Sequence, residues 1–263
     1  MIKKEDVEYI LSKAYVPEHI VSLIKLISSG EPYLMDDHLF LVKDRLLMFI
    51  GYPLQKKFDQ IECADLIVKT ANKFNTDHIR LIAPFIPETL IKECEVLERD
   101  AYYRLDINGI QIENDLERVC RKASEKVSVY RGKRISNQHR KLISEFMERA
   151  EPGSRVRDLY MSMDKYIPSS ETAYTLDARD RDDKLTAFYV VDEAADRFHT
   201  YLIGCHSRDN YVPHASDLLL REMIRIAQNE GKDFIHLGLG VNEGIRRFKE
   251  KWSGYPFLDY EYC

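Results

Sequence analysis

Two glycines end a short apolar run near the end of the chain, DFIHLGLG at residues 233–240. Read as a buried strand, this run places Gly238 and Gly240 at its carboxyl end, the edge at which α/β sheets bind ligands. Glycine has no side chain to keep a ligand away from the backbone, so both are candidate ligand-binding residues. An ordinary tight turn explains them equally well, because G-x-G-x-x-x-G is not a dinucleotide fingerprint.

A basic helix is predicted directly after these glycines, and Gly254 closes it. Glu243 is a candidate general base, although an acid in the first turn of a helix is equally expected from the helix dipole. Lys249 is a candidate catalytic cation, with a solvated helix face as the alternative for it and, more strongly, for Lys251. The other candidates on this helix would bind an acyl donor or a phosphate: Asn242, Phe248 and Arg246.

The elements that must position these residues occur in the same order twice. Residues 185–207 predict a hairpin, 215–230 a helix that ends at Gly231, 233–240 a strand, and 257–262 an edge or terminal strand after the basic helix. The first half gives a hairpin at 38–54, a helix at 59–74, a strand at 79–85, a helix at 87–98 and a strand at 102–107. We therefore predict an α+β protein with mixed sheets flanked by helices, duplicated as domains 1–112 and 113–263.

This order of elements resembles the GNAT acyltransferase fold. The last fifty residues resemble the Fem-type aminoacyltransferases and the C-terminal domain of phosphatidylglycerol lysyltransferases, families that pair two GNAT-like domains in tandem. The shared features are an apolar helix ending in a glycine, a strand ending in glycines, and an aromatic–lysine pair before a glycine: here Gly231, Leu237-Gly238-Leu239-Gly240, Phe248-Lys249 and Gly254.

The resemblance implies an acyltransferase whose co-substrate is aminoacyl-tRNA or acyl-CoA, with no covalently bound cofactor and no metal. Lys249 matches the Fem-type lysine, which is implied to steady the donor or the oxyanion. The implied acceptor is an amine or hydroxyl of a small molecule, a peptidoglycan precursor or a lipid. The N-terminal domain would then be a degenerate copy, and any active cleft would lie between residues 197–207 and 233–240.

One departure from the GNAT pattern bears on the donor. A CoA-binding GNAT has a glycine-rich loop whose N–H groups hold the pyrophosphate, whereas residues 207–215 here read SRDNYVPHA. Pro213 has no N–H to offer and Asp209 would repel phosphate. This favours aminoacyl-tRNA, and leaves open a CoA-dependent N-acyltransferase with an atypical loop or a non-catalytic GNAT-like binding or regulatory protein. Tyr211 and His214 are candidate donor-binding residues, and Tyr211 and Tyr174 are placed at the cleft rim by analogy.

A basic segment at residues 131–141 is the candidate contact for tRNA or another phosphate-rich ligand, through Arg131, Lys133 and Arg134. Solvated helix ends are the alternative. Cys205 and His206 end the other strand beside the expected cleft, and a buried structural cysteine is favoured over a nucleophile. His236 lies mid-strand and reads as a core histidine.

Composition sets outer limits on these hypotheses. The 263 residues are 44% hydrophobic, enough for a core, and their net charge of −5 argues against nonspecific coating of nucleic acid. No apolar run reaches the roughly 20 residues of a membrane span. The N-terminus lacks the apolar region of a signal peptide. Five scattered cysteines indicate reduced thiols in a cytoplasmic protein.

Overall fold

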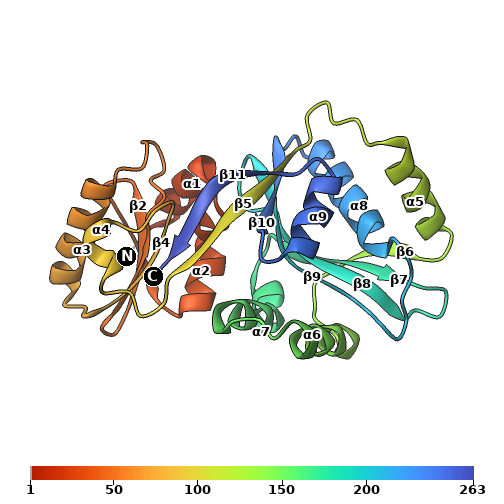
Figure 1. The fold of residues 1–263 in the computed structure, drawn as a ribbon, viewed down its shortest axis with the longest axis horizontal. Coiled ribbons are helices and arrows are strands. Elements are labelled where there is room, and N and C mark those ends of the chain that lie inside the picture. Colours follow the sequence, from red (N-terminus) through yellow and green to blue (C-terminus); the bar gives the residue numbers. More distant parts are fainter. Residues whose placement is uncertain (1) are drawn as a thin grey trace. The chain divides into compact units, whose positions relative to one another are not determined.

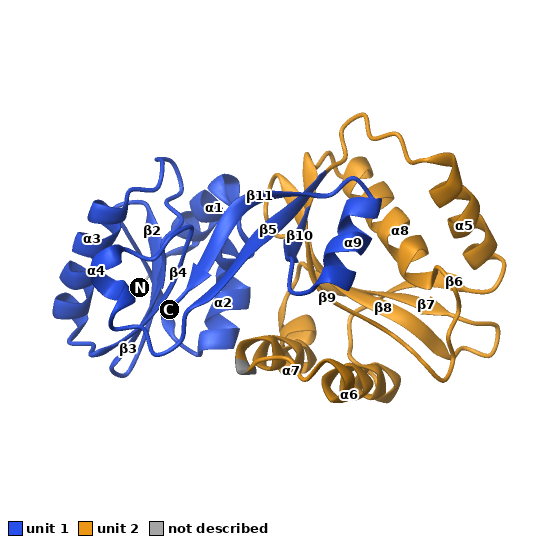
Figure 2. Cartoon of the chain, viewed as in Figure 1, with its two compact units in different colours: residues 1–105, 236–263 blue, residues 106–235 orange. Residues whose placement is uncertain are grey.

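A computed structural model describes residues 2–263, which form two compact units (Figure 2). The first unit contains the chain up to Leu105 together with His236–Cys263, and the second contains Asp106–Ile235. Strand β10 (Phe234–Leu239) begins in the second unit and ends in the first. Units defined by packing need not coincide with repeated halves, so the division into domains at residue 112 stays a prediction.

The first unit is built on a mixed sheet with strand order β1-β2-β3-β4-β11-β5-β10 (Figure 1). Strand β3 pairs with β4 in parallel, and the pairs β1–β2, β2–β3, β4–β11 and β11–β5 are antiparallel. The strands other than β10 are β1 (Glu31–Met35), β2 (His38–Lys43), β3 (Leu46–Ile50), β4 (His78–Ala83), β5 (Glu98–Asp106) and β11 (Tyr255–Tyr262).

Helices pack on both faces of this sheet because successive side chains of its strands point to opposite sides. In β2, Leu39 and Leu41 join a core with Ile10 and Ile24, whereas Phe40 joins a second core. That second core contains residues of α3, such as Ile67. The helical segments of the unit are α1 (Lys4–Lys13), a 3-10 turn (Pro17–His19), α2 (Val21–Ser28), α3 (Gln60–Phe74), α4 (Glu88–Ile91) and α9 (Glu243–Lys251).

The last strand is not the edge strand that its alternating sequence predicts. Strand β11 lies between β4 and β5 and is antiparallel to both, with Tyr262 opposite Ile82 and Tyr255 opposite Arg104. Alternation reports that a strand is half buried, and it carries no information on how many strands flank it. The C-terminal residues are therefore an interior part of the first unit's sheet.

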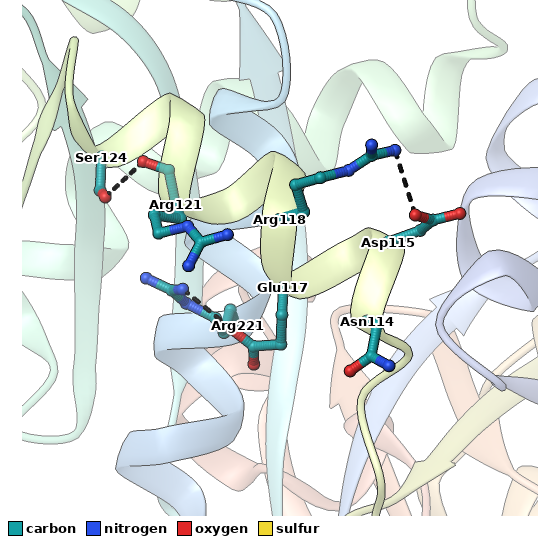
Figure 3. Close-up of a pocket in the computed structure, with 7 residues that line it drawn as sticks. All are labelled: Asn114, Asp115, Glu117, Arg118, Arg121, Ser124 and Arg221. Carbon is teal, nitrogen blue, oxygen red and sulfur yellow. Dashed lines mark hydrogen bonds and ion pairs between the residues drawn. The ribbon is translucent and has the colours of Figure 1, made fainter.

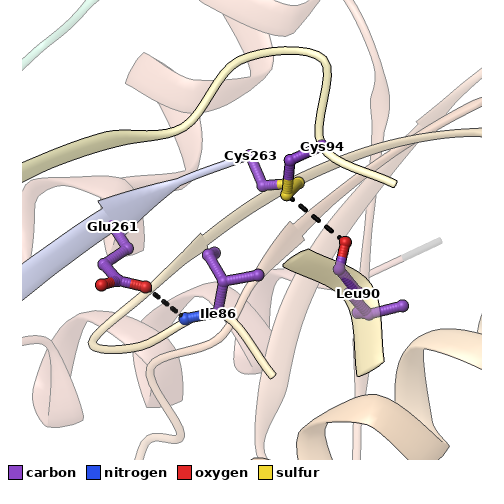
Figure 4. The surroundings of a disulfide bond; sticks show 5 residues. All are labelled: Ile86, Leu90, Cys94, Glu261 and Cys263. Carbon is purple, nitrogen blue, oxygen red and sulfur yellow. Dashed lines mark hydrogen bonds between the residues drawn. A yellow bond between two sulfur atoms is a disulfide. The ribbon is translucent and has the colours of Figure 1, made fainter. Parts of the chain in front are cut away.

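The prediction of five reduced cysteines is wrong for two of them. Cys94, which follows α4, forms a disulfide with Cys263, with their Cα atoms 5.3 Å apart (Figure 4). The two residues are 169 positions apart, so sequence spacing gave no hint of the pair. The free cysteines among the described residues, Cys63, Cys120 and Cys205, are buried.

The second unit has an antiparallel sheet of order β9-β8-β7-β6. Its central strand β8 presents Phe188 to His139 of α6 and Tyr189 to Ser216 of α8, so these helices cover opposite faces. The strands are β6 (Ser128–Gly132), β7 (Ala173–Arg179), β8 (Leu185–Asp192) and β9 (Phe198–His206); the helices are α5 (Asn114–Ser124), α6 (Asn137–Ala150), α7 (Ser154–Ser169) and α8 (Ala215–Asn229).

The polar composition of residues 168–183 predicts a loop, and the structure instead has strand β7 within this stretch. It is buried although it contains Thr175 and Asp177, because Asp177 accepts hydrogen bonds from His139 and Arg179 at 2.9 and 2.8 Å. Polar residues in this strand are thus satisfied by partners that the local sequence does not display. Across residues 2–263, no helix combines the length and the hydropathy that a membrane crossing requires.

Candidate functional site

Lys249 is buried, with only 2% of its surface exposed, although it lies on a helix whose other charged residues face solvent. Its ammonium donates a 2.5 Å hydrogen bond to the carbonyl oxygen of Leu239, at the end of β10. The same nitrogen lies 5.3 Å from the ring centroid of Tyr103 in β5. A solvated helix face therefore describes Arg247 and Lys251, but it does not describe Lys249.

Burial also changes the proton affinity of this amine. Removal from water lowers the pKa of Lys249 to about 7, and the nearby carboxylate of Asp100 acts in the opposite direction. At neutral pH the side chain is therefore divided between a free amine, which accepts a proton, and an ammonium, which donates hydrogen bonds. These are the two states that an acid–base group needs.

Asp100 of β5 fixes the backbone beside this lysine. Its carboxylate accepts hydrogen bonds from the N–H groups of Ala101 and Val241, both at 2.7 Å, and lies 3.8 Å from the guanidinium of Arg246. Tyr103, three residues further along the same strand, donates a 3.4 Å hydrogen bond to Glu250 of α9. The site is thus built from β5, the end of β10 and α9, all within the first unit.

Tight packing accounts for the glycines around the lysine. Gly238 has a φ of +72°, which favours glycine. A side chain on Gly240 would meet Asp100 at 2.7 Å, and one on Gly254 would meet the carbonyl oxygen of Lys249 at 2.9 Å. The protein's own atoms therefore lie close to the backbone at Gly240 and Gly254. The binding of a donor by Gly238 and Gly240 stays a prediction.

The other candidates of the C-terminal helix have structural partners. Asn242 is the N-cap of α9, since its side chain accepts a 3.0 Å hydrogen bond from the N–H of Ile245. Glu243 is exposed and forms an ion pair with Arg247. Phe248 is half buried, 5.1 Å from the ammonium of Lys251. Of the catalytic candidates, Lys249 is the one that burial and hydrogen bonding single out.

His236 and Cys205 are both buried, as expected for a core histidine and a structural cysteine. His236 is fully buried, packs edge-on against Tyr102 at 5.0 Å and accepts a 3.1 Å hydrogen bond from the N–H of Gly238. Burial lowers its pKa to about 3, so it is neutral. Burial raises the pKa of the Cys205 thiol, which disfavours a thiolate nucleophile.

The basic segment before α6 is largely occupied within the second unit. Arg131 Nη2 donates to both carboxylate oxygens of Glu193, at 2.7 and 2.8 Å, and the guanidinium lies 3.6 Å from the centroid of the Tyr174 ring. Lys133 donates to two backbone carbonyl oxygens at 2.7 Å, and Arg134 is exposed. Tyr174 itself is fully buried, contrary to its expected place at a cleft rim. Reversing the charges of Arg131 and Lys133 would therefore disturb packing as well as any phosphate contact.

Comparison with known proteins shows that several solved structures share the fold of this chain. No protein-family model matches the chain, and no curated protein matches it. Several solved structures do match the chain. The structure of FemX matches with a TM-score of 0.63 and 10% sequence identity, and the match covers 99% of this chain and 96% of FemX. The C-terminal domain of a proposed lysylphosphatidylglycerol synthetase from Agrobacterium fabrum matches with a TM-score of 0.57 at 15% identity, over 98% and 91%. A tandem GNAT protein from the clavulanic acid biosynthesis pathway matches with a TM-score of 0.54 at 11% identity, over 99% and 94%.

The chain has the tandem GNAT fold. The predicted fold class and the predicted resemblance to Fem-type and lysylphosphatidylglycerol-synthetase structures are thereby confirmed. Identities of 10–15% extend the likeness to the fold and no further.

The loop before α8 is the segment whose sequence departs from the glycine-rich loop of a CoA-binding GNAT, and it has side-chain contacts of its own at the helix N-terminus. His214, with a φ of +66°, is the N-cap of α8, and its Nδ1 hydrogen-bonds the carboxylate of Asp217 at 2.9 Å. Asp217 is buried in the first turn, where its negative charge occupies the positive end of the helix dipole. Tyr211 is exposed on this loop, 6.1 Å from the ring of His206.

Two residues of the lysine site were missed from the sequence. Asp100 and Tyr103 lie in a strand of the first half, whereas the partners of Lys249 were expected in the second half. The run ERDAYYRLD predicts a strand, and nothing in it indicates that the strand borders the C-terminal helix. The cleft expected between residues 197–207 and 233–240 stays a prediction.

Proposed function

We propose that this protein is an acyltransferase that moves an aminoacyl group from aminoacyl-tRNA to an amine or hydroxyl acceptor, in the cytoplasm, where charged tRNA is available. The observation that carries the proposal is the buried Lys249, with a pKa of about 7, held at the end of β10. It lies within the Phe-Lys pair through which the chain resembles the Fem-type transferases. The acceptor is a small molecule, a peptidoglycan precursor or a lipid.

The reaction has two requirements: a group that accepts a proton from the acceptor, and a positive charge close to the ester carbonyl. As the acceptor nitrogen or oxygen forms a bond to the ester carbon, the carbonyl oxygen becomes an oxyanion, and the bond to the ribose oxygen of the tRNA then breaks. Neutral Lys249 accepts the proton that the acceptor loses. The resulting ammonium returns that proton to the departing ribose oxygen, so the lysine ends in its starting state.

The surroundings of Lys249 suit this role. The hydrogen bond to the Leu239 carbonyl uses one of the three donor hydrogens of the ammonium, which leaves two for reacting oxygens. The face of the Tyr103 ring favours the charged form. Asp100 does so as well, which keeps the pKa from falling further below neutrality.

Aminoacyl-tRNA is favoured over acyl-CoA as the donor by the N-terminus of α8. The buried Asp217 and its partner His214 lie where the pyrophosphate of CoA would need N–H groups and positive charge. An anion placed there would meet a carboxylate that cannot move into solvent without unpacking the helix turn.

The test is a transfer assay with two donors and a matched pair of lysine variants. Radiolabelled aminoacyl-tRNA and acetyl-CoA are each offered with a panel of amines, peptidoglycan precursors and phospholipid vesicles. We expect label to pass from the tRNA, with Lys249→Met reducing the rate by about 10²–10⁴-fold, the range for loss of an acid–base group. Lys251→Met, two residues along the same helix and exposed, should retain the rate.

The other outcomes identify the alternatives. Transfer from acetyl-CoA alone would make the protein a CoA-dependent N-acyltransferase with an atypical loop. Equal rates for the two lysine variants would remove Lys249 from the mechanism. A folded protein that transfers from neither donor to any acceptor of the panel would favour a non-catalytic binding or regulatory protein.

A further inference from the structure

A hollow of about 530 Å³ lies between α5 and α8 in the second unit (Figure 3). This volume is within the range of ligand sites, roughly 300–1,000 Å³. Three arginines and two carboxylates line it: Arg118, Arg121, Arg221, Asp115 and Glu117. The excess of one positive charge makes it a local basic site on a chain whose net charge is −5.

The pairing of these charges leaves one guanidinium without a carboxylate. Arg118 pairs with Asp115 at 3.0 Å, and Arg221 pairs with Glu117 at 3.2 Å. Within residues 2–263, no carboxylate of the described chain lies at ion-pair distance from Arg121. Figure 3 shows the guanidinium groups of Arg121 and Arg221 turned toward the same hollow.

The arrangement follows from how α5 packs. Leu116, Cys120 and Ala123 form its buried face, so Glu117 and Arg121 lie along its border. These two residues are at i and i+4, the spacing at which a helix normally forms a Glu–Arg pair. Here the Glu117 carboxylate bonds to Arg221 of α8 instead, and this pairing across the helices leaves the Arg121 side chain available to an anion.

We propose that this hollow binds a phosphodiester group of the donor tRNA, held by Arg121 and Arg221. The inference rests on the proposed function, because it takes the donor to be a tRNA. Guanidinium groups bind phosphate oxygens in bidentate geometry. The Glu117 carboxylate is paired with Arg221, so the positive charge in the hollow that is not balanced by a carboxylate is that of Arg121. Arg131 and Lys133 are engaged with Glu193 and with backbone carbonyls, so of the predicted phosphate contacts in that segment Arg134 is the exposed one without such a role, and the hollow offers a further cation for RNA.

The experiment measures binding of uncharged tRNA to the full-length protein by filter binding between 50 and 200 mM KCl. The variants are Arg121→Gln and the matched control Arg225→Gln. Arg225 is on α8, is exposed and is paired with Glu222 at 2.6 Å, and it does not line the hollow. Both changes remove one positive charge from an exposed helix position, so any general effect of net charge is the same in both.

We expect Arg121→Gln to weaken binding about 5–10-fold at 50 mM KCl and to reduce the slope of log K against log[KCl] by about 1, as for one lost phosphate contact. Arg225→Gln should bind like the unchanged protein. Circular dichroism and thermal unfolding confirm that both variants fold.

Three results would overturn the inference, and they are distinguishable. If the unchanged protein binds tRNA and both variants bind it equally, the hollow is not the site, while the proposed function stands. If the unchanged protein does not bind tRNA, both the hollow and the donor assignment fail. If Arg121→Gln weakens binding of inorganic pyrophosphate, measured by calorimetry, and leaves tRNA binding unchanged, the ligand is a small phosphate compound.

Discussion

The carboxylate of Asp100 accepts a 2.7 Å hydrogen bond from the backbone N–H of Val241, which lies 141 residues later in the chain. Val241 has a φ of +57°, in the left-handed region that β-branched residues seldom adopt. Strain of this kind persists where the surrounding structure holds it, and it clusters at functional sites. Leu239, whose carbonyl oxygen accepts the hydrogen bond from Lys249, begins the turn that contains Val241. By bonding to Val241, Asp100 therefore holds this turn, and the carbonyl group at its start, in place.

The same carboxylate raises the pKa of Lys249, and this gives the first prediction. Asp100→Asn removes the charge and should lower the pKa of Lys249 below about 7. If the free amine is the active form, the acidic limb of the pH–rate profile of aminoacyl transfer moves to lower pH. Asp106→Asn, an exposed position on the same strand, serves as the control. A lower rate with an unmoved limb would mean that Asp100 acts on structure alone.

Burial of Lys249 also predicts how stability depends on pH. The folded pKa of about 7 is below the ordinary value of 10.5, so between these pH values the unfolded chain binds more protons than the folded one. The free energy of unfolding therefore rises with pH through this window, by up to about 1.4 kcal/mol per pH unit from this group. Below pH 7 both states are protonated and the contribution is constant.

Lys249→Met isolates this contribution. Between pH 7 and pH 9.5, we expect the free energy of unfolding of the unchanged protein to increase relative to that of the variant. Urea unfolding at the two pH values measures it, and other titrating groups cancel in the comparison. A difference that does not change with pH would show that the lysine keeps its ordinary pKa.

Gly254 supports the helix that carries the lysine, and it predicts a further difference in stability. A methyl group at this position would lie 2.9 Å from the Lys249 carbonyl oxygen and 2.8 Å from a carbon of Leu237. Gly254→Ala should destabilise the protein by about 1–3 kcal/mol. Gly153→Ala, where a methyl group meets nothing within 4 Å, should change the melting temperature little. Equal melting temperatures for the two variants would contradict the packing described for α9.

Local patterns in the sequence were enough to predict most of the helices and strands. They did not predict which residues that are distant in the sequence contact each other. Helical spacing in α8 and the apolar run of β10 predicted both elements, because burial of one face leaves a periodic trace. Strand β7 was missed because His139, 38 residues away, satisfies Asp177. The lysine site was found only in part, since the aromatic–lysine pair is local and its partners Asp100 and Tyr103 are distant in the chain.

The disulfide predicts which cysteines react with an alkylating agent before and after reduction. Cys63 and Cys205 are buried, and burial raises the pKa of the Cys63 thiol to about 12, so neither forms a thiolate readily. In the folded, oxidised protein we expect little alkylation by iodoacetamide. A reductant should then expose Cys94 and Cys263, which are only partly buried, and these two should be modified first. Intact-mass and peptide mass spectrometry give the count and the positions. Rapid alkylation of Cys94 without reductant would show that the pair is reduced in the purified protein, as the sequence alone predicted.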